Sequence, residues 1–109
     1  MKKMLIGLAA AAGIVFGGAA HAAVDAAKAK QLATKYNCMA CHALDKKLVG
    51  PAYNEVAKKY KGDKSAQEKL FGKVKNGGSG VWGAIPMPPN AAVPDADIKT
   101  LVEWVLSLQ

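Results

Sequence analysis

Apolar residues recur at helical spacing along most of the chain, and no stretch alternates apolar and polar residues as a half-buried strand would. Asp25 is a suitable cap for a first helix, in which Leu32 and Tyr36 share a face. We expect that helix to end near Asn37. A second helix is expected over residues 51–60, because a proline suits the first helical position.

Two further helices complete the predicted skeleton. Ser65 and Glu68 have the spacing of a capping box, and Gly77 follows the helix that they would begin. A last helix is expected to start around Pro94 and Asp95. Its apolar residues form a single stripe, which is typical of a helix packed on a core: Ile98, Leu101, Val102, Val105 and Leu108. The fold class predicted is all-α, with one domain and no internal repeat.

The beginning of the chain has the pattern of a secretory signal peptide. Lys2 and Lys3 precede an apolar run over residues 4–20, and a small-x-small site follows at residues 20–22. We expect cleavage after Ala22, which leaves residues 23–109 as the mature domain. The alternative is an uncleaved membrane anchor, but the apolar run is shorter than the roughly 20 residues that span a bilayer.

The net charge changes with that cleavage. It falls from +7 to +5 once Lys2 and Lys3 are removed. All basic residues are lysines, whereas proteins that bind nucleic acid depend heavily on the planar fork of arginine. Nucleic acid is therefore not expected as a partner. A lysine surface is either simply solvated or used for docking.

A domain of this size buries a small core and often needs a disulfide, metal or cofactor to stabilise it. The chain has only two cysteines, Cys38 and Cys41, so a disulfide framework is excluded. A local bridge across two residues, or chemistry at the thiols, remains.

The two cysteines belong to the segment Asn-Cys-Met-Ala-Cys-His, residues 37–42. C-x-x-C-H is the attachment sequence of a c-type haem, in which two thiols add to the vinyl groups and the histidine binds iron. Three alternatives are weaker. A zinc site needs four ligands, a thioredoxin-like dithiol is expected beside a βαβ unit, and chance is the third. Haem c, with its iron, is the predicted cofactor.

Haem iron has a second axial position, and His42 is the only histidine after cleavage. Met87 is the candidate, because a thioether favours ferrous iron and Met39 is held at the ring edge inside the attachment segment. Pro86, Pro88 and Pro89 surround Met87 and restrict its backbone. Such a frame reduces the entropy lost when the sulfur binds iron. The alternative is that Met87 only packs in a turn.

Four segments together resemble the small bacterial class I cytochromes c of the c-551 and c-552 type: "NCMACH", "LVGPAY", "KNGGSGVWGAIPMPPN" and "EWVLSL". The resemblance covers essentially the whole mature chain. It implies about four short helices wrapped around one covalently bound haem, with His42 and Met87 as axial ligands. The expected signal peptide predicts export to the periplasm.

The resemblance implies further contacts around the haem. The Pro51 carbonyl would accept a hydrogen bond from the second nitrogen of His42, and Trp82 would reach a propionate. Asn90 would lie near the ligand sulfur. Where relatives often carry an arginine near a propionate, this chain has Lys73, a point charge without the planar fork.

Each of these residues also has an ordinary structural role. Pro51 can simply start a helix, and Trp82, like Trp104, can be a packing residue. Asn90 suits a turn after two prolines.

With both axial positions filled by protein, the iron has no open site for a substrate. The expected function is therefore electron transfer by a monomeric carrier that is not an enzyme. In the family, such carriers serve a nitrite reductase, a terminal oxidase or a peroxidase, with a membrane quinol-oxidising complex as donor. Lysines near the haem edge would steer the carrier to acidic partners. Two alternatives remain: a gas sensor or peroxidase-like enzyme from which Met87 dissociates, and an interaction module without haem.

Overall fold

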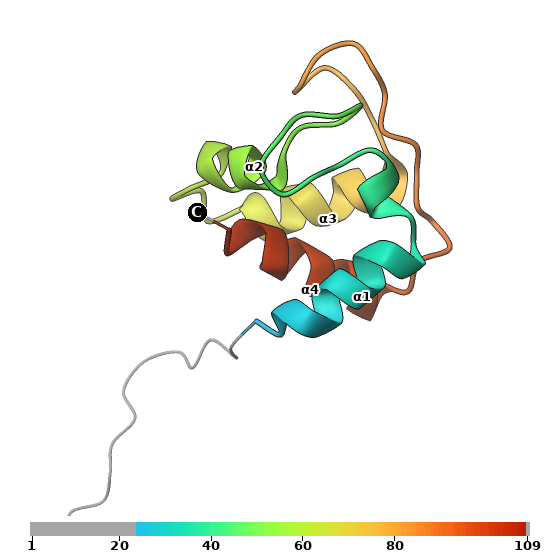
Figure 1. Ribbon diagram of the computed structural model, residues 1–109. Helices are drawn as coiled ribbons and strands as arrows, with labels where there is room; N and C mark the ends of the chain where they lie inside the picture. The colour runs from blue at the N-terminus through green and yellow to red at the C-terminus, as the bar shows by residue number, and fades with distance from the viewer. Residues whose placement is uncertain (1–23, 109) are drawn as a thin grey trace, which may run out of the picture.

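The computed structural model describes residues 24–108; the expected signal peptide and the cleavage after Ala22 lie outside them. Four α-helices and one short 3₁₀ helix make up the chain: α1 (Ala26–Lys35), η1 (Cys38–Ala40), α2 (Tyr53–Lys59), α3 (Ala66–Asn76) and α4 (Asp95–Leu106). Residues 24–108 form no strand, only two isolated β-bridges. The all-α prediction is confirmed (Figure 1).

Helix α4 packs against each of the other three α-helices. It is buried along the stripe expected from the sequence, from Ile98 to Val105, while Leu108 follows the helix and is half-buried. Trp104 and Ile98 are the largest fully buried side chains among the described residues. Figure 1 shows α4 and α1 lying across each other, at the end of the molecule opposite the long loops. The core therefore leaves those loops free to build a site.

The first helix begins as predicted. The Lys28 backbone N–H donates to Asp25 Oδ1 at 3.0 Å, so that Asp25 caps α1. The helix ends at Lys35, two residues before Asn37, which has a left-handed backbone with φ 60°. The Tyr36 hydroxyl donates to Asp97 Oδ2 at 2.8 Å and ties the end of α1 to α4.

The predicted start of the second helix is wrong. Helix α2 begins at Tyr53, and Pro51 precedes it, because Ala52 is extended with ψ 141°. The Pro51 carbonyl thus lies outside the helical hydrogen-bond pattern and contacts His42 Nδ1 instead.

The capping box before the third helix is also wrong, although α3 itself is present. The Ser65 side chain makes no capping bond; its hydroxyl donates to Asp63 Oδ1 at 2.7 Å. Lys69 and Ser65 together hold the pKa of Asp63 down at about 2. The turn before α3 is therefore held by the Asp63 carboxylate and not by a serine cap. Gly77 ends α3 as expected, with φ 73°.

Ile98→Ala tests whether α4 stabilises the fold independently of the functional site. Ile98 is fully buried and does not line the pocket described below. We expect the free energy of unfolding to fall by about 2–5 kcal/mol, the usual cost of such a truncation. Denaturant unfolding measures this loss. The absorption spectrum of the folded variant should remain that of the wild type, and a changed spectrum would show that α4 reaches the site through Ile98.

Candidate functional site

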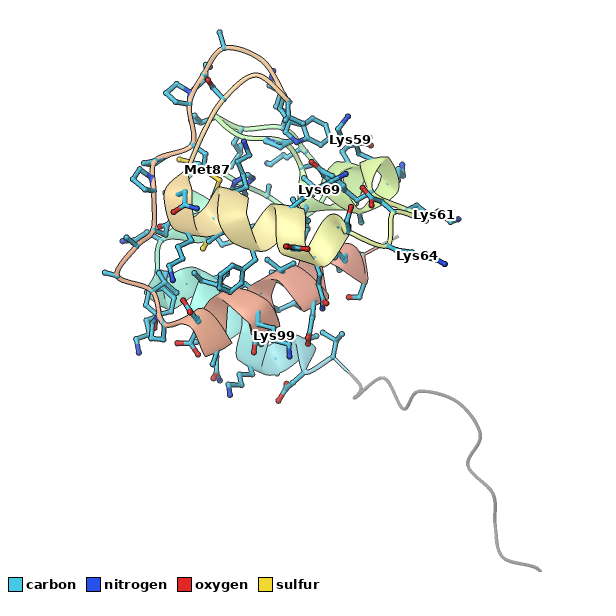
Figure 2. All side chains as sticks on the ribbon, turned by 180° about the vertical axis from the view of Figure 1, so that it is seen from behind. Lys59, Lys61, Lys64, Lys69, Met87 and Lys99 are labelled. Atoms are coloured by element: carbon cyan, nitrogen blue, oxygen red, sulfur yellow. The ribbon has the colours of Figure 1, made fainter. Side chains whose placement is uncertain are left out.

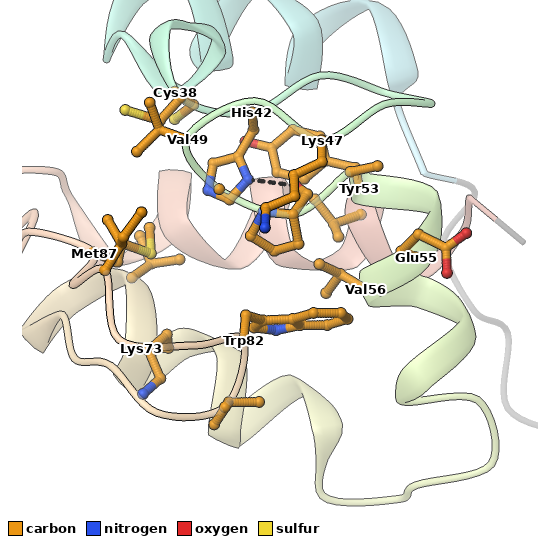
Figure 3. A pocket seen from close by; sticks show the side chains of 18 of the residues that line it. Cys38, His42, Lys47, Val49, Tyr53, Glu55, Val56, Lys73, Trp82 and Met87 are labelled. Carbon is orange, nitrogen blue, oxygen red and sulfur yellow. Dashed lines mark hydrogen bonds between the residues drawn. The ribbon is translucent and has the colours of Figure 1, made fainter.

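A pocket of about 590 Å³ lies between the long loops and the helices. That volume is in the range of small-molecule and cofactor sites. Its floor includes Leu101 and Val105 of α4, and its walls come from the segment around η1, from the start of α2 and from the loop after α3. Figure 3 shows the labelled side chains converging on it from these different elements. Residues far apart in the sequence therefore share one largely apolar pocket.

Cys38, Cys41 and His42 all line the pocket. The left-handed Asn37 turns the chain out of α1 and into η1, and the backbone N–H groups of Cys41 and His42 both donate to the Cys38 carbonyl, at 3.2 and 3.1 Å. This tight turn presents all three side chains on one wall. Neither cysteine is in a disulfide, and burial raises the pKa of the Cys38 thiol.

His42 is held by its neighbours in one orientation. Its Nδ1 lies 2.8 Å from the Pro51 carbonyl oxygen, the contact implied by the resemblance (Figure 3). A carbonyl only accepts, so Nδ1 carries the proton and Nε2 keeps its lone pair. Gly50 packs so closely that a Cβ there would lie 2.6 Å from His42 Cε1. The Tyr53 ring stacks on the imidazole, with centroids 4.8 Å apart.

Met87 enters the pocket from the loop after α3, and its backbone is fixed there. Met87 and Gly78 exchange two backbone hydrogen bonds, of 2.8 and 3.0 Å. A Cβ on Gly77 would lie 2.5 Å from the Met87 carbonyl oxygen, so only glycine allows this approach. Met39, the other methionine of the described residues, is exposed and does not line the pocket.

Asn90 fastens the same loop to α3. Its backbone N–H donates to the Val74 carbonyl at 2.9 Å, and its side-chain amide donates to the carbonyls of Val74 and Pro88, both at 3.2 Å. The turn role considered for Asn90 is therefore present. A contact with the Met87 sulfur stays a prediction.

Trp82 and Lys73 also line the pocket. Trp82 is 42% exposed and is covered on one side by the Lys59 ammonium, 5.6 Å from the ring centroid. The Lys73 ammonium lies over Gly78, so close that a Cβ there would be 2.7 Å from Nζ. Contacts of Trp82 and Lys73 with propionates stay predictions. Trp104 is a packing residue, 2% exposed.

Two neighbours of His42, Gly50 and Tyr53, were not singled out by the sequence analysis. Both stand in the segment "LVGPAY", which entered only as part of the resemblance. The signal in the sequence was a Gly-Pro step, residues 50–51, only eight residues after His42. Their contacts with the imidazole depend on how the loop over residues 43–50 folds back, which the sequence pattern does not show.

The residues present fit a covalently attached haem. Two thiols stand beside an imidazole whose Nε2 is free to coordinate, and a thioether enters from a different wall of the same apolar pocket. Nitrogen and soft sulfur donors are the axial ligands found in cytochromes c. An all-helical domain built around this donor set is a small class I c-type cytochrome.

Comparison with known proteins identifies the same class. The cytochrome c family model matches residues 26–109, and the chain belongs to this family. It is 47% identical to cytochrome c-552 of Nitrosomonas europaea, with both chains covered completely. It is 57% identical to cytochrome c-551 of Allochromatium vinosum over 71% of this chain and 82% of that protein.

Solved structures agree with the fold. The crystal structure of Nitrosomonas europaea cytochrome c552 matches with a TM-score of 0.71 at 52% identity, over 73% of this chain and 99% of that one. The class 1 cytochrome MtoD from Sideroxydans lithotrophicus matches with a TM-score of 0.70 at 40% identity, over 79% and 98% of the two chains. The class I cytochrome c fold is therefore confirmed, and with it a covalently bound haem c and its iron, for which Cys38 and Cys41 match the attachment motif. These relatives are electron-carrying cytochromes.

Proposed function

We propose that this protein is a periplasmic single-electron carrier in which His42 and Met87 are the axial ligands of one haem c, attached through Cys38 and Cys41. The observation that carries the proposal is the position of Met87. Of the two methionines among residues 24–108, it alone lines the pocket that His42 also enters. The mature domain would be residues 23–109, released from a leader over residues 1–22.

Each ligand has a structural reason for its role. The Pro51 carbonyl holds the proton of His42 on Nδ1, which leaves the lone pair of Nε2 to bind iron. The Met87 backbone is fixed by its two bonds to Gly78 and by the flanking prolines. When bound, the haem supplies an iron that cycles between ferrous and ferric states. With two protein ligands there is no open position, so the protein would not be an enzyme.

Three further residues would contact the haem or its ligand. Trp82 would donate its indole N–H to a propionate, and Lys73 would supply a positive charge near one. Both side chains already line the pocket. Asn90 would lie near the Met87 sulfur, because it anchors the loop that carries it.

The partners would be redox proteins met through brief, small interfaces. A nitrite reductase, a terminal oxidase or a peroxidase would accept the electron, and a membrane quinol-oxidising complex would donate it. None of the helices in residues 24–108 is long and apolar enough to cross a membrane. A monomer is proposed for so small a carrier.

The lysines differ in their position relative to the pocket. Lys46 and Lys47 are exposed and line it, whereas Lys59, Lys61, Lys64 and Lys69 gather beside the α2–α3 turn (Figure 2). Lys99 lies on α4, apart from the lysines of the α2–α3 turn (Figure 2), and does not line the pocket. Complementary charges across an interface steer the encounter and fix its register. Lys46 and Lys47, at the pocket that would hold the haem, are therefore the proposed docking charges.

Met87→Ala tests the ligand pair. We expect the oxidised variant to lose the near-infrared sulfur-to-iron charge-transfer band, and its potential to fall because a ligand that favours ferrous iron is gone. Near-infrared absorption and redox titration measure these changes. Met39→Ala, which removes the thioether outside the pocket, is the control and should keep both. A wild-type protein without the band, or a Met87 variant with unchanged function, would support a gas sensor or a peroxidase-like enzyme instead.

Pro86→Ala and Pro88→Ala test the stiffness of the Met87 loop. Both changes enlarge the set of conformations open to the free loop. The loop therefore loses more conformational entropy when the Met87 sulfur binds iron. We expect a weaker charge-transfer band and a lower potential, with the covalent haem still attached. Unchanged band and potential would show that the prolines only shape the turn.

Lys47→Gln tests docking, with Lys99→Gln as a control of equal charge change on a distant exposed site. At low salt we expect electron transfer to the natural partner to slow roughly two- to fivefold in the first variant only, the range of a surface charge pair. The difference should vanish at about 1 M salt, where charges are screened within about 3 Å. Stopped-flow kinetics at several ionic strengths measure it. A rate that is insensitive to salt would refute steering.

A further inference from the structure

Tyr53 lies face to face with the imidazole of His42. The two ring centroids are 4.8 Å apart and the planes differ by 21°, so the rings are stacked. Aromatic pairs at this separation attract by more than their buried area alone explains. The contact therefore acts on the orientation of the imidazole plane, which a single hydrogen bond at Nδ1 leaves partly free.

Tyr53 is itself immobilised. It is 8% exposed. Its backbone N–H donates, at 2.8 Å, to the carbonyl of Ala43, the residue that follows His42. Its ring meets the edge of Trp104, with centroids 5.6 Å apart and planes at 75°, and Trp104 is 2% exposed in α4. The stack thus connects the imidazole, through Tyr53, to one of the largest fully buried side chains of the described residues.

Gly50 blocks movement of the imidazole in another direction. A Cβ at this position would lie 2.6 Å from Cε1, 3.0 Å from Nδ1 and 3.1 Å from Nε2 of His42. The imidazole is therefore enclosed by the Tyr53 ring, the Gly50 backbone and the Pro51 carbonyl. Real side chains do not approach as closely as that Cβ would, so an added methyl group must displace the imidazole.

We propose that Tyr53 is a positioning residue that sets the plane of the His42 imidazole, through the aromatic ring rather than the hydroxyl, and so fixes how Nε2 is presented to the iron. The inference rests on the proposed role of His42 as a ligand. Groups that touch a ligand histidine commonly orient it and tune the metal. The hydroxyl lies beside Cys38 rather than His42, and burial raises the pKa of Tyr53.

The test compares Tyr53→Leu with Tyr53→Phe in the haem-loaded protein. The phenylalanine keeps the stacked ring and loses the hydroxyl, whereas the leucine loses the ring. We expect the g values of the oxidised protein, measured by electron paramagnetic resonance, to shift in Tyr53→Leu and to stay at wild type in Tyr53→Phe. In the reduced protein, solvent exchange of the His42 Nδ1 proton, followed by NMR, should quicken roughly two- to tenfold in the leucine variant alone, the factor that losing an aromatic pair implies.

Leu32→Ala controls for simple loss of packing. Leu32 belongs to the same buried cluster as Tyr53 and does not line the pocket. It should destabilise the fold and leave the g values and the Nδ1 proton exchange unchanged. If it produced the same shifts as Tyr53→Leu, or if Tyr53→Leu produced none, the positioning role would be overturned.

Gly50→Ala gives a second test that does not depend on the folding of Tyr53→Leu. The φ of Gly50 is outside the left-handed region, so the backbone accepts alanine while the new methyl group presses on the imidazole. We expect shifted g values. Gly72→Ala adds the same methyl group in α3, where nothing lies within 4 Å, and should change nothing. Equal spectra for the two alanine variants would contradict the enclosure of His42.

Different measurements test the positioning role of Tyr53 and the proposed ligand pair, so either proposal can be refuted without the other. The charge-transfer band of the wild-type protein tests Met87, and its absence would overturn the ligand pair. The comparison of g values among the Tyr53 variants tests the imidazole plane. A wild-type band together with identical spectra for Tyr53→Leu and Leu32→Ala would overturn the role of Tyr53 alone.

Discussion

Helix α4 is the constraint on which the rest of the structure depends. It packs against α1, α2 and α3, and its residues Leu101, Val102 and Val105 also line the pocket. One face of one helix therefore serves the core and the cofactor site together. A domain with so small a core cannot keep these functions apart, because the area that stabilises it without the haem is limited. Burial of the haem and burial of the core are then parts of the same packing.

The two sides of the pocket reach their geometry in different ways. On the cysteine side, the tight turn of η1 and the contacts of Gly50, Pro51 and Tyr53 act directly on His42. On the opposite loop, the constraint acts on the backbone of Met87. An imidazole has a plane and a tautomer to be controlled, whereas a thioether is flexible and has neither, so placing its backbone restricts it most. The structure therefore restrains His42 through contacts with its side chain and Met87 through its backbone.

Several parts of the fold were predictable because they depend on local chemistry. The Asp25 cap, the glycine that ends α3 and the buried stripe of α4 all follow from spacing within a few residues. The errors lie where a distant or competing partner decided the outcome. Pro51 lies outside α2 after an extended Ala52, with its carbonyl against His42. The Ser65 hydroxyl donates to Asp63 and makes no capping bond to α3. In both cases the residue types fitted the predicted role, and another hydrogen bond was available nearby.

The candidate site also has features that local sequence determines and features that only tertiary contacts determine. The order of residues alone determined that two thiols and a histidine are adjacent, and that one methionine sits among prolines, because covalent neighbours and restricted dihedral angles are properties of the chain itself. Tertiary structure decided which surfaces enclose the imidazole. Gly50 and Tyr53 reach His42 only after the loop over residues 43–50 folds back, and Trp104 supports that contact from α4. A stack of rings requires surfaces brought together by packing, and no spacing within a linear sequence encodes the resulting distance or angle between their planes.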